Sequence, residues 1–190
     1  MLGFGCSFVI DGYDDFMDDI VIQVAGQGDG EMLRQISCDM GTEKPLHYFE
    51  IGLERQAKGK SFTFVMSVGG QVIGYCLLNL APKYKPYARL EIPEIQDLNV
   101  LPDYRRRGFG RQIITHCESV ARERGFEQIG ISFGLDSSYG AAQRLYVQMG
   151  YVPDGLGVTY DREFVRAGDI RAVDDDLCLM LIKDLAKTAA

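Results

Sequence analysis

The chain has 190 residues, 46% hydrophobic and 25% charged, which are the proportions of one ordinary globular domain with a buried core. These values exclude collagen-like, fibrous and broadly disordered chains. The 27 acidic and 20 basic side chains give a formal net charge of −7, so we expect neither a nucleic acid nor an anionic membrane as a partner.

The 5 cysteines stand singly, without a C-x-x-C pair or a histidine at zinc-ligand spacing, so we expect no metal site. The same pattern is typical of a reducing compartment, and we expect a cytoplasmic protein. Neither an apolar run of bilayer length nor a signal-peptide pattern stands out, so insertion into a membrane and export are not expected. Residues 1–19 combine glycines with aspartate pairs, and we expect a flexible tail there, followed by one domain over residues 20–187.

The first half of the chain predicts a strand, two helices and a hairpin. Apolar positions mark a strand over residues 20–24, and a helix follows from Asp29 or Gly30 to about Gly41. A second helix is expected from Pro45 to about Ala57. Two apolar runs, separated by two glycines and a glutamine, predict a hairpin with strands over residues 62–68 and 72–78.

The second half alternates strands and helices. A loop over residues 82–87 leads to a strand over 92–100, which we expect to be central, and a helical stripe follows over 111–123. The remaining expected elements are a strand over 129–133, a helix over 137–149, an extended segment from 151 and a last strand over 177–182. Residues 154–158 and 174–176 are expected to be loops. The result is one mixed α/β domain of order β-αα-β-β-β-α-β-α-β.

The most informative stretch runs from Leu98 to Arg111, LNVLPDYRRRGFGR, and places two glycines between a strand and a helix. The first N–H groups of such a helix have no intrahelical partner and lie at the positive end of its dipole, so this junction can bind a phosphate or diphosphate. Gly108 and Gly110 leave the backbone open, and the neighbouring arginines add positive charge. Without the glycines, the arginine run would indicate only a solvated surface or a nucleic-acid patch.

The spacing of this stretch separates it from two common phosphate-binding motifs. The pattern G-x-G-x-x-G fails because Ile113 stands at the third glycine, and a P-loop fails because Gly-Lys does not follow Gly108 at the required distance. What remains is Arg105-x-x-Gly108-x-Gly110 after a strand that ends in Leu-x-Val-x-Pro. This pattern resembles motif A of the GNAT superfamily, the acyl-coenzyme A-dependent N-acyltransferases.

A second segment strengthens the resemblance. Ala142-x-x-Leu145-Tyr146-x-x-x-Gly150-Tyr151 is similar to a later segment of the same family and lies on a predicted helix. The order of elements agrees as well, and the resemblance covers about residues 20–185. It implies a GNAT-like mixed sheet with a splayed central strand pair, acetyl-coenzyme A as co-substrate and transfer of its acetyl group to a primary amine.

The resemblance also implies roles for individual residues. The diphosphate of coenzyme A would be held by the motif, and the pantetheine and acetyl carbonyl would contact main-chain groups of the fourth strand. Tyr146 would protonate the departing thiolate, although an aromatic side chain on an amphipathic helix is often only part of a core. Relatives often have asparagine where this chain has Tyr139, which puts a contact to coenzyme A at that position in question. The cofactor-binding residues are Leu98, Val100, Arg105, Arg106, Arg107, Gly108, Phe109, Gly110, Arg111 and Tyr139.

Two carboxylates on the fourth strand are candidates for the base that deprotonates the amine. Glu94 is favoured because it stands where some relatives have a catalytic glutamate. Asp97 is nearer the acetyl end but would point to the opposite face of a regular strand. Either residue could instead serve only in an ion pair, and an ordered water could replace both.

The acceptor is the least defined part of the prediction. The resemblance implies a small-molecule or peptide amine and allows a homodimer. Aspartates in the predicted loops 154–158 and 174–176 would attract a cationic amine if they overhang the cleft. Residues 83–87 are a second candidate for its rim. The alternative function is a non-catalytic module that senses acyl-coenzyme A or binds another protein.

Overall fold

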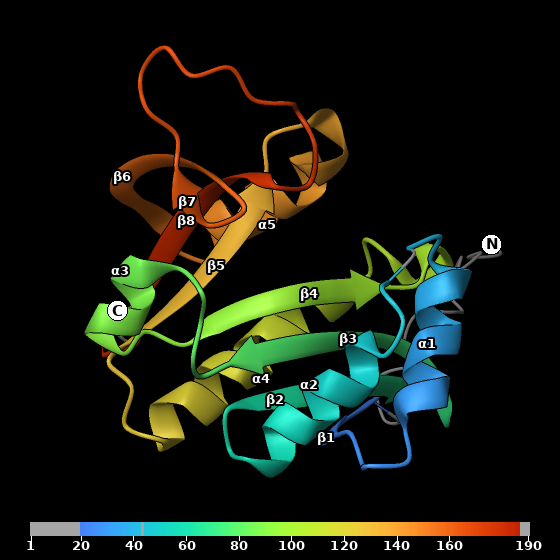
Figure 1. Ribbon diagram of the computed structural model, residues 1–190. Helices are drawn as coiled ribbons and strands as arrows, with labels where there is room; N and C mark the ends of the chain where they lie inside the picture. Colours follow the sequence, from blue (N-terminus) through green and yellow to red (C-terminus); the bar gives the residue numbers. More distant parts are fainter. Residues whose placement is uncertain (1–19, 43, 187–190) are drawn as a thin grey trace, which may run out of the picture.

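The computed structural model describes residues 20–42 and 44–186, which form an eight-stranded sheet with helices on both faces (Figure 1). The strand order is β1-β2-β3-β4-β5-β8-β6-β7, in which β4 and β5 are parallel and the other neighbours antiparallel. The strands are β1 (Ile20–Val24), β2 (Ser61–Val68), β3 (Gln71–Asn79), β4 (Glu94–Val100), β5 (Gln128–Gly134), β6 (Val152–Tyr160), β7 (Glu163–Phe164) and β8 (Leu177–Asp184). The α-helices are α1 (Gly30–Asp39), α2 (Tyr48–Ala57), α3 (Lys85–Leu90), α4 (Phe109–Glu123) and α5 (Gly140–Gln148).

Alternating side chains of the sheet bury two separate cores. On β2, Phe64 and Met66 belong to the core that also contains the apolar stripe of α4. Val65, between them, packs into the second core with residues of α1 and α2. Because successive strand residues point to opposite faces, this one strand requires a helical cover on both sides. The predicted mixed α/β architecture is confirmed.

The centre of the sheet is splayed. β4 pairs with β5 only at Glu94–Gly130 and Ile95–Ile131, and the two strands then diverge (Figure 1). On its other side, β4 has a bulge: between its pairs with Tyr75 and Leu77 of β3, two residues of β4 stand opposite one. Asp97 lies in this bulge with a φ of 49°, in the left-handed region. The predicted splayed strand pair is thus present, together with an irregularity that a regular alternation does not predict.

Several boundaries differ from the expected ones. The loop expected at 82–87 leads into α3, whose Tyr87 is buried and packs with Tyr84 and residues of β8. α2 begins at Tyr48 rather than Pro45, because His47 has a left-handed φ of 62°. The prediction of a loop at 154–158 is wrong. These residues belong to β6, whose pairing with β8 shifts register between Pro153 and Val158.

The predicted tail over residues 1–19 lies outside the described residues, as does the domain end predicted at 187. No helix among the described residues has both the length and the apolar character needed to cross a membrane.

Candidate active site

The turn from β4 into α4 leaves backbone N–H groups open. Gly108 caps α4 with a φ of 89°, a conformation that strains any other residue type. The N–H of Gln112 reaches the carbonyl of Gly108 at 3.1 Å, which makes it the first intrahelical bond of α4. The N–H groups of the three residues before it, 109–111, therefore have no carbonyl partner within the helix.

A cavity of about 530 Å³ opens over this turn. Its walls come from β4, from the turn 104–108, from the first turn of α4 and from α5, where Ala141 and Ala142 present small side chains. Three arginines and no acidic residue are among the described residues that line it, although the chain as a whole has a charge of −7. An anion of the size of a diphosphate fits this combination of open backbone and local positive charge. The lining residues are Leu98, Val100, Tyr104, Arg105, Arg106, Gly108, Gly110, Arg111, Ala141, Ala142, Leu145, Tyr146 and Gln148.

Seven of the ten predicted cofactor-binding residues line this cavity, and three do not. The Arg107 guanidinium lies over the ring of Tyr104, 5.6 Å from its centroid. Phe109 is buried in the core, so only its backbone can face the cavity. Tyr139 lines a neighbouring cavity instead.

This second cavity, of about 300 Å³, lies between the diverging strands. Leu98 and Tyr146 line both cavities, so the two spaces meet at these side chains. Tyr146 is 6% exposed, and burial raises the pKa of its phenol well above the ordinary value. A phenol in this environment stays protonated and can donate its proton.

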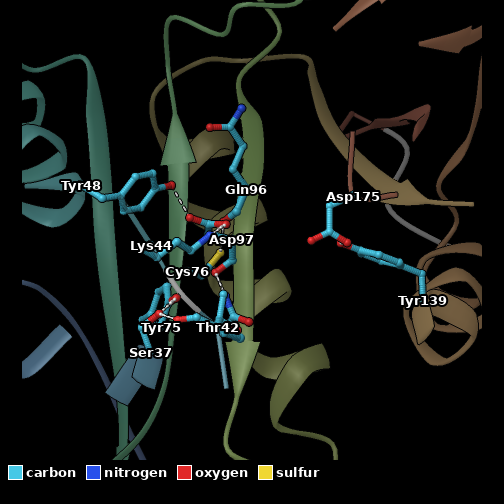
Figure 2. A network of polar contacts seen from close by, with 11 residues as sticks. Ser37, Thr42, Lys44, Tyr48, Tyr75, Cys76, Gln96, Asp97, Tyr139 and Asp175 are labelled. Carbon is cyan, nitrogen blue, oxygen red and sulfur yellow. Dashed lines mark hydrogen bonds and ion pairs between the residues drawn. The ribbon is translucent and has the colours of Figure 1, made fainter. Parts of the chain in front are cut away.

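Asp97 lines the second cavity, next in sequence to Leu98. Its carboxylate accepts hydrogen bonds from Lys44 Nζ at 2.7 Å and from the hydroxyl of Tyr48 (Figure 2). Burial, followed by the neighbouring carboxylate, raises the pKa of Tyr48 well above its ordinary value. The bulge turns Asp97 into this network, which is the physical reason why the alternation of a regular strand is a poor guide to its direction.

Glu94, the favoured base, occupies a different environment. Its side chain is fully buried, and its Oε1 lies 3.0 Å from Nη2 of Arg162. Gln96 donates a hydrogen bond to its other oxygen at 2.8 Å. Burial raises the pKa of Glu94, while Arg162 and Gln96 oppose that rise. Glu94 is absent from the described lining of either cavity, so the structure brings Asp97, and not Glu94, into the cleft.

The opposite wall of the second cavity contains a second carboxylate. Tyr139 donates a hydrogen bond to Asp175 at 3.0 Å, and both residues line the cavity. Figure 2 shows this pair across from the Asp97 network. The sequence left open whether the acidic segment 174–176 borders the cleft, and Asp175 does line this cavity. Asp174 instead accepts a hydrogen bond from Tyr160 at 2.8 Å.

The prediction that residues 83–87 form a rim of the acceptor cleft is wrong. Tyr84 and Tyr87 are buried, and neither they nor the two lysines belong to the described lining of the cavities. Lys83 pairs with Asp161 at 2.7 Å and Lys85 with Glu163 at 3.0 Å. These ion pairs join the segment to the β6–β7 turn on both sides of Arg162.

The contacts of Lys44, Tyr48 and Arg162 with the two candidate carboxylates were not predicted. Each of these residues lies far in sequence from the strand residue that it contacts, and none belongs to a recognisable motif. A single sequence offers no signal for contacts of this kind. Ala142, by contrast, is the first residue of the predicted A-x-x-L-Y segment, and Ala141 directly precedes it.

Comparison with known proteins agrees with this geometry. Residues 31–151 match the model of the acetyltransferase (GNAT) family. An uncharacterised N-acetyltransferase of Chlorobaculum tepidum is 30% identical over 88 residues, which is 46% of this chain and 48% of that protein. The match thus spans about half the length of this curated relative.

Solved structures share the fold at low sequence identity. A chimera of the spermidine N-acetyltransferase SpeG of Vibrio cholerae with hSSAT has a TM-score of 0.65 and 14% identity, covering 89% of this chain and 97% of the chimera. The yncA protein of Salmonella typhimurium, whose structure includes its cofactor acetyl-CoA, has a TM-score of 0.64 and 17% identity, covering 91% and 98%.

Proposed function

Since the chain belongs to the acetyltransferase (GNAT) family, we propose that it transfers the acetyl group of acetyl-coenzyme A to a primary amine of a small molecule or peptide. The observation that carries this proposal is the junction of two cavities at Leu98 and Tyr146. One cavity fits an anionic nucleotide, and the other has carboxylates suited to a cationic amine. The acetyl group would react where they meet.

The diphosphate of the co-substrate would lie on the backbone N–H groups at the start of α4, with Arg105, Arg106 and Arg111 around it. The splayed part of β4 offers main-chain groups of Leu98 and Val100 to the pantetheine and to the acetyl carbonyl, where an N–H would stabilise negative charge. Bound there, acetyl-coenzyme A supplies an activated thioester.

Asp97 is the proposed base. It would take a proton from the incoming ammonium, directly or through a water, while Lys44 and Tyr48 hold its carboxylate in place. Tyr146 would then donate its proton to the sulfur as the C–S bond breaks and the new C–N bond forms. Glu94 is better suited to a structural role, since its carboxylate is buried against Arg162.

The reaction needs no covalent intermediate on the protein. Cys117 is fully buried, with its Sγ 3.9 Å from that of Cys76, so it is poorly placed to attack a thioester. We therefore expect sequential kinetics through a ternary complex. The predicted homodimer and cytoplasmic location stay predictions.

Release of free thiol from acetyl-coenzyme A across a panel of amines tests the function. Turnover with at least one amine, reduced strongly in Tyr146→Phe, would support the transferase. Tight binding of coenzyme A with no turnover on any amine would favour the alternative, a sensor of acyl-coenzyme A. An acetylated protein that survives removal of free acetyl-coenzyme A would contradict direct attack.

A further inference from the structure

A third cavity, of about 220 Å³, lies between α2 and strands β2, β3 and β4, on the face of the sheet that α1 and α2 cover. Gln96 and Asp97 line both this cavity and the second one. Asp97 thus stands between the proposed site of acetyl transfer and a space that the transfer itself does not use. The described residues that line it are Tyr48, Phe49, Ile51, Gly52, Arg55, Ser61, Thr63, Tyr75, Leu77, Asn79, Gln96 and Asp97.

Several polar groups of this cavity are already paired with one another or with the backbone. Ser61 donates to the carbonyl of Gly52, and Tyr75 donates to Ser37. Asn79 accepts a hydrogen bond from Arg55 at 3.1 Å and donates one to Gln96 at 3.3 Å. The surface that remains for a bound molecule is therefore mainly aromatic and aliphatic. It is formed by Tyr48, Phe49, Ile51, Tyr75 and Leu77.

The volume limits the size of a guest. An apolar cavity of about 150 Å³ is large enough for benzene, so about 220 Å³ holds one ring with a short linker, or a branched alkyl group of similar bulk. A polyamine fits poorly, because its second ammonium would have to leave water for apolar walls.

The charged residues near Asp97 indicate which group of the acceptor lies outside the third cavity. Lys44 and Arg162 also line the second cavity, but they pair with Asp97 and Glu94. Asp175 accepts a hydrogen bond from Tyr139 and forms no ion pair with a described residue, so its carboxylate favours a cation in this cavity. We infer that the acceptor is a primary amine on a compact apolar body, aromatic or branched alkyl, which binds beneath α2 while the amine passes Asp97 towards Leu98 and Tyr146. This inference rests on the proposed function and names its substrate class.

Gly52 supplies a specific test. It lies inside α2, and a Cβ at this position would meet no atom within 4 Å, so a side chain here occupies open space. Gly52→Leu is expected to fill the cavity while leaving the helix intact, since leucine is a good helix former. Glu54→Leu, on the exposed side of α2 and absent from the described lining of the cavity, is the matched control.

The experiment compares 2-phenylethylamine, 3-methylbutylamine, spermidine and a short peptide as acceptors of the full-length protein, with thiol release as the readout. Burial of one ring predicts a kcat/KM for 2-phenylethylamine about tenfold or more above that for spermidine. Gly52→Leu should lower this value about tenfold or more, chiefly through KM, with the KM for acetyl-coenzyme A unchanged and the melting temperature no lower than before. Glu54→Leu should stay near the original value.

Two results would overturn the inference. If spermidine or the peptide is acetylated and the apolar amines are not, the function stands and the substrate class is wrong. If Gly52→Leu folds and still acetylates 2-phenylethylamine with an unchanged KM, the cavity beneath α2 is not its binding site. A protein that binds coenzyme A but acetylates no amine would contradict the proposed function itself, and the inference with it.

Discussion

Lys44 Nζ lies 2.7 Å from Oδ1 of Asp97, and this ion pair joins the connection between α1 and α2 to the bulge of β4. Both side chains are largely buried, with 17% of Lys44 and 21% of Asp97 exposed. Tyr48 contacts the same carboxylate from the start of α2. The strand proposed to present the acetyl group and the helices proposed to cover the acceptor are therefore held together at one carboxylate.

The role of Asp97 as base is tested by Asp97→Asn, which keeps the shape of the side chain. We expect kcat to fall about 100-fold at pH 7 with the KM for acetyl-coenzyme A unchanged, because the amine loses its proton acceptor. Tyr48→Phe removes one hydrogen bond to Asp97 but keeps the carboxylate, so its kcat should fall much less. If kcat falls in Glu94→Gln while Asp97→Asn keeps full activity, Glu94 is the base instead.

Tyr146→Phe removes the proposed acid with little change of shape. We expect kcat to fall about 100-fold while coenzyme A binds as before. Burial raises the pKa of Tyr146, so the phenol keeps its proton above pH 10, and the pH profile of kcat should show no decline from this group up to that pH. A decline below pH 10 that disappears in Tyr146→Phe would contradict the assignment.

Much of the fold could be predicted from sequence because periodicity and glycine positions are local signals. The strand-glycine-helix turn around Gly108 is formed by consecutive residues, so its pattern can be recognised in the sequence. The same holds for the segment that contains Tyr146. The bulge at Asp97 could not be predicted, since it depends on pairing with β3. The same holds for the burial of Glu94 against Arg162, whose partners are distant in sequence.

The backbone at Gly108 is tested against an equivalent glycine elsewhere. Gly108 and Gly125, at opposite ends of α4, have φ values of 89° and 84°, and a Cβ at either would meet no atom within 4 Å. Alanine at each should therefore cost a similar amount of stability, about 1 kcal/mol. Calorimetry should show about tenfold weaker binding of coenzyme A to Gly108→Ala only, because that strain shifts the N–H groups of the turn. Equal affinity in both variants would argue against the turn as the binding site.

The pair of Glu94 and Arg162 predicts a stability that depends on pH. Arg162→Met leaves a buried carboxylate without its cation, which typically costs about 3–5 kcal/mol. Burial raises the pKa of Glu94 in the folded protein, and without Arg162 that pKa rises further. The folded state then binds a proton that the unfolded state releases, so the loss of stability should be small near pH 5 and grow as pH rises through the folded pKa.

Denaturant unfolding of Arg162→Met at several pH values measures this trend. Glu94→Gln combined with Arg162→Met removes the carboxylate and should flatten the pH dependence. A loss of stability that is equal at pH 5 and pH 8 would show that Glu94 does not depend on Arg162 for its charge.

The most direct test of the proposed function is calorimetric titration of the protein with coenzyme A and with pantetheine, which lacks the diphosphate and the adenosine 3′-phosphate attached to it. Two charge-assisted hydrogen bonds from the start of α4 predict that coenzyme A binds about 100-fold or more tightly. Equal affinity for the two compounds, or no heat with coenzyme A, would contradict the claim that the turn at Gly108 holds the diphosphate.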